Sequence, residues 1–152
     1  MHIVLIEPEI PQNTGNIART CALTGTDLHL VKPLGFSLAD RYLKRAGLDY
    51  WDEVKVTVWD SFEEIKAAYK KAGFYLATTK ARRIYTEVCY RPHDFLVLGR
   101  ETRGLPPAML QEYGDSTIRV PMRDLGRSLN LANTAAILLF EALRQQGFPQ
   151  LK

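Results

Sequence analysis

A chain of 152 residues is long enough for one domain whose hydrophobic core needs neither a metal nor disulfide bonds. Hydrophobic residues make up 46% of the sequence and charged residues 24%, which excludes an intrinsically disordered protein. The net charge of +3 favours an anionic partner such as a nucleic acid only weakly.

The cysteines and the amino terminus exclude further classes. Cys21 and Cys89 have no CxxC motif and no neighbouring histidine, which argues against a zinc site and a disulfide framework, so we expect two buried thiols. The apolar run at residues 3–6 is too short for a signal peptide, and no window approaches a membrane span. We therefore expect a cytoplasmic protein that contacts no membrane.

The first part of the chain has the pattern of a βαβ unit. Ile3–Ile6 is a compact apolar run that predicts a buried strand. Turn and N-cap residues at Asn13–Asn16 precede a helical pattern over Ile17–Leu23, which Thr24 and Gly25 end. Leu28–Val31 predicts a second strand, stopped by a proline.

The middle of the chain continues this alternation. Ser37–Arg45 predicts a short helix with basic residues on one side. Val54–Val58 alternates with polar residues, as in a strand, and Ser61–Glu64 reads as a capping box for a helix that ends at Gly73.

The second half adds further strands and two helices. Apolar runs at Phe74–Ala77 and Phe95–Leu98 predict strands, separated by an irregular basic stretch. Pro106–Tyr113 predicts a helix, and Thr117–Val120 predicts the last strand. The closing helix, residues 130–146, is apolar at nearly every position, so we expect it to be buried on more than one side and to suit a partner subunit.

Taken together, these elements predict a mostly parallel α/β sheet flanked by helices, in a single domain spanning residues 1–152. The sequence lacks GxGxxG after the first strand, GxxxxGK[ST], GxSxG and HExxH. Its three histidines, His2, His29 and His93, are scattered, which argues against a hydrolase triad and a metal cluster.

Several polar loop residues remain as candidates, each with an ordinary alternative. Asn13 and Arg19 flank a helix start and could hold a phosphate, or Asn13 makes a turn and Arg19 is solvated. Glu101 and Arg103 could form an ion pair that braces a loop. Ser128 and Asn130 could simply cap the last helix. No single residue decides between these alternatives.

Three segments together resemble a known family. NTGNIAR at 13–19, LGRETRGLP at 98–106, and IRVPM with RSLNLAN within 118–133 are similar, in order and spacing, to the motifs of the SPOUT methyltransferases. EPEIPQNTGN, KPLGF, RAGLDY and FEALRQQG extend the resemblance over nearly the whole chain. It is most similar to the small tRNA 2′-O-methyltransferases of the TrmL (YibK-like) group, which modify the wobble nucleotide.

The resemblance implies a fold, a cofactor and a substrate. The fold would be the SPOUT fold, with a deep trefoil knot in its carboxy-terminal part, an exception to the rule that chains are not threaded. The cofactor would be S-adenosyl-L-methionine, without a metal. The substrate would be the wobble (position 34) pyrimidine in the anticodon stem-loop of tRNA, bound by a homodimer. Two alternatives stay open: another RNA such as rRNA, or a non-catalytic RNA-binding protein of the same fold.

The resemblance also implies roles for particular residues. Arg19, with a nearby phosphate, would assist deprotonation of the ribose hydroxyl, although arginine is a poor base. The positions that would orient Arg19 and the ribose are Asn13, Glu101, Ser128 and Asn130, with Asn16 and Asn133 as secondary candidates. The cofactor contacts would be Ala77, Thr78, Leu98, Gly99, Val120, Ser128 and Leu129. At Gly99, the missing side chain would let the backbone approach the ligand closely.

Basic residues supply candidates for binding RNA phosphates, namely Arg41, Lys44, Arg45, Lys80, Arg82, Arg103 and Arg127.

The chain also departs from the group at three places. Phe140 and Ile6 stand where many relatives have tyrosine, so no tyrosine role transfers. Arg100 replaces a common proline, and its charge either favours RNA or is an ordinary surface charge.

Overall fold

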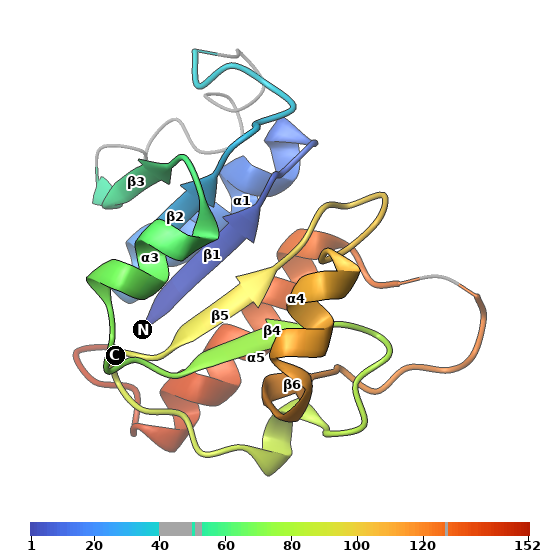
Figure 1. Cartoon of the computed structure of the whole chain (residues 1–152). Helices are drawn as coiled ribbons and strands as arrows, with labels where there is room; N and C mark the ends of the chain where they lie inside the picture. Colours follow the sequence, from blue (N-terminus) through green and yellow to red (C-terminus); the bar gives the residue numbers. More distant parts are fainter. Residues whose placement is uncertain (40–49, 51–52, 127) are drawn as a thin grey trace.

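The computed structural model describes residues 1–39, 50, 53–126 and 128–152. A six-stranded sheet, in the order β3-β2-β1-β5-β4-β6, forms its centre, and every pairing between neighbours is parallel (Figure 1). The strands are β1 (His2–Ile6), β2 (Asp27–Val31), β3 (Val56–Trp59), β4 (Phe74–Ala77), β5 (Phe95–Leu98) and β6 (Thr117–Ile118).

Helices cover both faces of the sheet (Figure 1). They are α1 (Pro11–Thr24), α3 (Phe62–Ala68), α4 (Pro107–Glu112) and α5 (Leu131–Gln145), with short 3-10 helices η2 (Tyr85–Glu87) and η3 (Gly114–Ser116). Along β1, Ile3 and Leu5 join a core with α1 and α5, whereas Val4 and Ile6 join a second core with α3 and α4. Because both faces are buried, the strands are continuous apolar runs, as the sequence predicted.

The strand order determines which loops meet. In a parallel sheet all carboxyl ends lie at one edge, and ligands of open α/β folds bind there. Leu5 of β1 is paired with Leu98 of β5, and Ala77 of β4 with Ile118 of β6. The loops that follow β1, β5, β4 and β6 therefore lie side by side at this edge.

The structure confirms the predicted strands and helices within its described residues but corrects several boundaries. Helix α1 begins at Pro11, before the expected cap at Asn13–Asn16, because a proline suits the first turn of a helix. Strand β3 begins at Val56, β6 already ends at Ile118, and α3 ends at Ala68 instead of Gly73. The helix expected at 37–45 falls mostly outside the described residues.

One burial prediction was wrong, that for Cys89, and the prediction for α5 is tested only in part by the single chain. Cys21 is buried, but Cys89 is exposed on the loop between β4 and β5. Helix α5 buries one face of the single chain, through Ala135, Leu138, Leu139, Ala142 and Leu143, while Phe140 is 46% exposed. Within the described residues, no helix is both long enough and apolar enough to cross a membrane.

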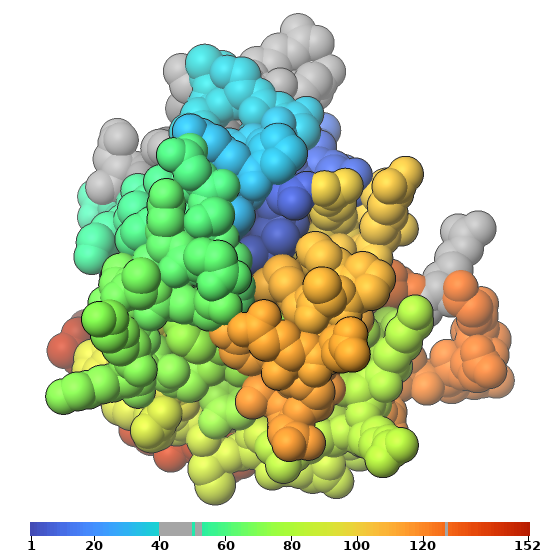
Figure 2. Space-filling model, in the orientation of Figure 1, coloured from blue at the N-terminus to red at the C-terminus, as the bar shows by residue number. Residues whose placement is uncertain are grey.

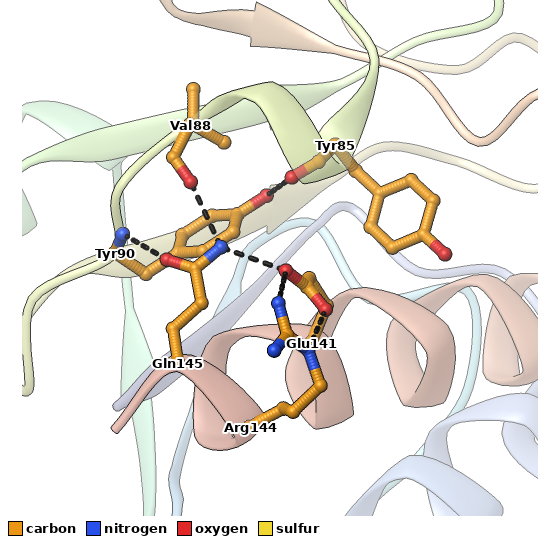
Figure 3. A network of polar contacts seen from close by, with 6 residues as sticks. All are labelled: Tyr85, Val88, Tyr90, Glu141, Arg144 and Gln145. Carbon is orange, nitrogen blue, oxygen red and sulfur yellow. Dashed lines mark hydrogen bonds and ion pairs between the residues drawn. The ribbon is translucent and has the colours of Figure 1, made fainter. Parts of the chain in front are cut away.

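A polar network ties the β4–β5 loop to the end of α5 (Figure 3). The Gln145 amide accepts a hydrogen bond from the Tyr90 backbone N–H at 3.0 Å and donates one to the Val88 carbonyl at 2.9 Å. The same amide donates to Glu141, whose carboxylate also pairs with Arg144. The Arg144 guanidinium lowers the pKa of Glu141, so this carboxylate stays ionised and the network stays intact at neutral pH.

Candidate active site

A cavity of about 660 Å³ lies at the carboxyl edge of the sheet, within the range of small-molecule sites. The loops after β4, β5 and β6 and the amino end of α5 form its walls. Its lining includes every residue predicted to contact the cofactor: Ala77, Thr78, Leu98, Gly99, Val120, Ser128 and Leu129. The structure thus brings these positions together, while their role stays a prediction.

The exposed segment 121–126 follows β6 and contributes Met122 to the cavity. In the space-filling view, this segment stands off from the body of the molecule at the right (Figure 2). Met122 is 38% exposed and Leu129 is also 38% exposed, so two large apolar side chains face solvent at the rim. An apolar part of a ligand bound against these side chains would remove this surface from water.

The need for glycine at position 99 is explained by contacts with the backbone of the same loop. A Cβ atom on Gly99 would lie 2.2 Å from the backbone carbon of Gly104 and 2.3 Å from the nitrogen of Leu105. The turn is closed by hydrogen bonds between Arg100 and Gly104 in both directions, and Gly104 has a φ of 68°. A close approach to the loop's own backbone therefore requires glycine here, and the expected close approach to the ligand stays a prediction.

Glu101 joins the loop after β5 to the loop after β1. Its carboxylate accepts hydrogen bonds from the backbone N–H groups of Glu9 and Ile10, at 2.8 and 3.2 Å, and from the Asn13 amide at 3.1 Å. In return, Glu9 accepts from the backbone and hydroxyl of Thr102. Of the alternatives for Glu101, the ion pair with Arg103 is not formed in the structure, and the carboxylate braces the loops through these N–H groups instead.

The Asn13 amide extends this network to α5. Its oxygen accepts a hydrogen bond from the Asn130 amide at 2.9 Å. The Asn130 oxygen accepts in turn from the backbone N–H groups of Ala132 and Asn133, at 2.9 and 3.3 Å, and so caps α5. The Glu101 carboxylate can only accept hydrogen bonds. The side-chain amides of Asn13 and Asn130 therefore each have one orientation that satisfies all their partners. Asn130 thus both caps α5 and connects this helix to the loops of the site.

Arg100 and Glu7 form a further contact between the same two loops, an ion pair between partly exposed side chains. Glu7 has a φ of 49°, a left-handed conformation that few residues other than glycine adopt. The two alternatives for Arg100 were a charge that favours RNA and an ordinary surface charge; the structure shows instead a charge paired with Glu7 within the chain.

Arg19 lies apart from the cavity. It is exposed on α1 and does not line the cavity, unlike Asn13, Glu101, Ser128 and Asn130. Its guanidinium carbon lies 5.0 Å from the centre of the Tyr50 ring. The structure therefore separates the arginine from the other residues predicted to act with it.

The predicted RNA contacts are only partly placed. Lys80 and Arg103 line the cavity, and Arg82 is exposed outside it. Arg41, Lys44, Arg45 and Arg127 lie outside the described residues. Arg119, a further basic residue that could contact RNA, also lines the cavity, and so do Thr134 and Leu131 of α5, which the sequence analysis did not single out. Helical spacing from Asn130 was the signal that could have found Thr134, which lies one turn later.

The described residues contain a possible metal-binding group at the opposite edge of the sheet, formed by His2, Asp27 and His29. The Trp59 indole donates to Nδ1 of His29 at 3.0 Å, so the neutral ring carries its proton on Nε2, which faces Nδ1 of His2 at 3.2 Å. This proton occupies the position that a metal would need. The cluster is a hydrogen-bonded pair of histidines, and burial lowers the pKa of each to about 4.

The cavity fits S-adenosylmethionine chemically. Leu98, Ile118 and Leu129 provide apolar walls for an adenine, and backbone groups at the strand ends can bind its edges. Hydroxyl groups of Thr78, Ser128 and Thr134 stand along the same lining and suit the polar parts of the molecule.

Comparisons with known proteins agree on one family. The model of the SpoU rRNA methylase family matches residues 1–140. A Bacillus subtilis protein named as a putative tRNA (cytidine(34)-2′-O)-methyltransferase is 55% identical, over 100% of this chain and 97% of its own length. A solved structure described as giving insight into "2-OH methylation of C/U34 on tRNA" is 43% identical, with a TM-score of 0.91, and the match covers 96% of this chain and 95% of that one.

A more distant solved structure shares the fold. It is a SpoU methyltransferase from Streptomyces viridochromogenes, described as a complex with the cofactor AdoMet, and it matches at 21% identity with a TM-score of 0.87. The match covers 100% of this chain and 59% of that one.

Proposed function

The chain belongs to the SpoU rRNA methylase family, and from this premise we propose that it methylates the ribose 2′-hydroxyl of the wobble pyrimidine, position 34, in tRNA. Membership confirms the resemblance to the SPOUT methyltransferases. The relatives that match over nearly their whole length carry this substrate in their names. The single observation that carries the proposal in this chain is the cavity lined by every predicted cofactor contact.

S-adenosylmethionine supplies a methyl group on a sulfonium. The residues of the chain then have to bind the cofactor, bring the 2′-oxygen into line with the methyl carbon and remove the hydroxyl proton. The lining of the cavity serves the first task, with Leu98 and Leu129 against the adenine and Ser128 beside the polar part. We assign Asn13 and Asn130 to holding the loops that position the ribose.

Glu101 and Arg19 have different roles in the remaining steps: Glu101 braces the loops and Arg19 binds the RNA. The Glu101 carboxylate accepts three N–H groups in the structure, which makes it a brace for the loops and leaves it poorly suited to accept the ribose proton. The pKa of arginine lies far above neutral, so Arg19 is also a poor base. Arg19 instead binds and orients an RNA phosphate, and that phosphate takes the proton.

The proposed enzyme acts as a homodimer on the anticodon stem-loop, in the cytoplasm. Helices α1 and α5 pack against each other, and each exposes a large apolar side chain, Leu23 at 57% and Phe140 at 46%, which supports a subunit contact through these helices. Arg19 lies on α1 away from its own cavity, so a second copy is the source from which the site would receive it. Light scattering should find a dimer at micromolar concentration, and a monomer would contradict this part.

We extend the proposal to the trefoil knot of the family. It is supported by the family membership and by the contacts that hold the end of α5 against the β4–β5 loop. An experimental backbone trace in which the carboxy-terminal segment passes through no loop of the preceding chain would contradict it.

The test of the function is methyl transfer from labelled S-adenosylmethionine to tRNA from cells that lack this protein, with the product mapped by mass spectrometry. We expect a 2′-O-methyl group at position 34. Transfer to rRNA, or to another tRNA position, would contradict the substrate but keep the chemistry. The Arg19→Ala variant should keep cofactor binding and lose methylation, whereas an RNA-binding protein without catalysis would have no methylation to lose.

A further inference from the structure

The role proposed for Arg19 requires a contact that holds its side chain in one position. It sits on the exposed side of α1, opposite Ile17, Ala18 and Cys21, which are buried in the core. Within the described part of the chain, Arg19 has no hydrogen bond and no ion pair. A long side chain with several freely rotating bonds loses much rotamer freedom when it must hold one position for a reaction.

Among the residues that the structure describes, the ring of Tyr50 meets the Arg19 guanidinium, whose carbon lies 5.0 Å from the ring centre. Tyr50 comes from a segment far from α1 in sequence. Its carbonyl accepts a hydrogen bond from the Glu53 backbone at 3.1 Å, and Val54 just beyond is buried in the core beside α1 and α5. The Tyr50 backbone is thus tied to Glu53, one residue before the core residue Val54, whereas Arg19 belongs to α1.

Stacking suits an arginine that must bind a phosphate. A guanidinium that lies over an aromatic ring uses its flat face for the contact, whereas its N–H donors point outward along the edge. An ion pair with a carboxylate would instead occupy those donors. The Tyr50 ring contacts the cation without accepting hydrogen bonds as a carboxylate would, so this contact does not use the N–H donors that an RNA phosphate needs.

We propose that Tyr50 is a positioning residue for Arg19, holding the guanidinium through its aromatic face in the orientation that methyl transfer requires. This inference rests on the proposed function, because it assigns Arg19 to the reaction. The ring is the required part, and the Tyr50 hydroxyl has no part in the mechanism.

The first experiment compares Tyr50→Phe, which keeps the ring, with Tyr50→Leu, which removes it, in steady-state methylation of tRNA. Tyr50→Phe should stay within about twofold of the wild type. Tyr50→Leu should lower kcat about tenfold while KM for tRNA and for S-adenosylmethionine changes less than about twofold, as expected for a cation–π contact that acts on orientation. In an Arg19→Lys background, Tyr50→Leu should cost clearly less than in the wild type.

A second experiment detects the contact between Tyr50 and Arg19 directly and needs no activity measurement. The Nε–H signal of Arg19 in an NMR spectrum, identified by its loss in Arg19→Lys, should be shifted by the Tyr50 ring current. The shift should survive in Tyr50→Phe and disappear in Tyr50→Leu, with melting temperature and cofactor affinity unchanged.

Several results would overturn the inference. Tyr50→Leu with wild-type kcat would do so, as would equal damage from Tyr50→Phe, which would assign the role to the hydroxyl. A rise in KM for tRNA with unchanged kcat would make Tyr50 an RNA contact instead. If the wild type methylates no tRNA, the proposed function fails separately, and the NMR comparison still decides whether Tyr50 orients Arg19.

Discussion

At the scale of single residues, Gly99 offers the sharpest steric test. A methyl group at this position would lie 2.2 Å from the backbone of Gly104, which cannot move without opening the turn that lines the cavity. Gly99→Ala should therefore lower the free energy of unfolding by about 2 kcal/mol, the usual size of an overpacking effect, and weaken S-adenosylmethionine binding. Urea unfolding and calorimetric titration measure the two effects.

Gly114→Ala is the matched control, since nothing lies within 4 Å of the added carbon. It should change stability by less than about 0.5 kcal/mol. A Gly99→Ala protein with unchanged stability and unchanged cofactor affinity would show that the turn can relax, and the steric explanation of Gly99 would have to be abandoned.

The histidine pair makes stability depend on pH. Burial lowers the pKa of His2 and of His29 to about 4, below the ordinary value of about 6.5. The unfolded chain therefore binds more protons between these values, and the folded state loses stability as the pH falls from 6.5 towards 4. We expect a loss of about 2 kcal/mol for one such imidazole between pH 7 and pH 5.

Urea unfolding at pH 7, 6 and 5 measures this dependence. The variant His2→Phe, which keeps an aromatic ring against Phe95, should show a weaker fall over the same interval, whatever its stability at pH 7. An identical pH dependence in the variant would mean that other groups, and not the histidine pair, titrate on unfolding.

At the scale of secondary-structure elements, Asn130 serves both α5 and the site. Its oxygen caps the helix, and its amide nitrogen donates to Asn13. Asn130→Ala should remove both contacts and lower the free energy of unfolding by about 1 kcal/mol. Asn130→Asp keeps the capping oxygen but cannot donate, so it should restore most of the stability and leave kcat for methylation well below that of the wild type.

Thermal unfolding and methylation of tRNA by the two variants separate the two roles. Full activity of Asn130→Asp would show that capping alone explains this residue and that the contact with Asn13 has no part in assembling the site.

The sequence predicted the elements well because their patterns are local. Continuous apolar runs such as Phe95–Leu98 belong to strands buried on both faces, and Asn130 before an apolar stretch marked the start of α5. The partners of Glu101 could not be predicted in this way, because Glu9 and Asn13 lie about ninety residues away and meet it only when β1 and β5 pair. The prediction that Cys89 is buried was wrong for a related reason. Its loop is held by a hydrogen bond from Gln145 of α5, which the local sequence around Cys89 does not reveal.

At the scale of the whole molecule, the position of Arg19 predicts how two chains share a site. The cavity of one chain is lined without Arg19, so in the proposed dimer a second chain would supply it. Two inactive variants then complement each other if their defects lie in different parts. Arg19→Ala leaves the cavity intact, and Val120→Arg places a charged side chain in the cavity while leaving Arg19 in place.

Mixing the two variants under conditions that exchange subunits should restore activity. Random pairing gives half hybrid dimers, each with one complete site of two, so the mixture should reach about a quarter of wild-type activity. Each variant alone should be inactive yet folded and dimeric by circular dichroism and light scattering. If Arg19 acts on the cavity of its own chain, no combination contains a complete site, and the mixture stays inactive, which distinguishes the two arrangements without a structure of the complex.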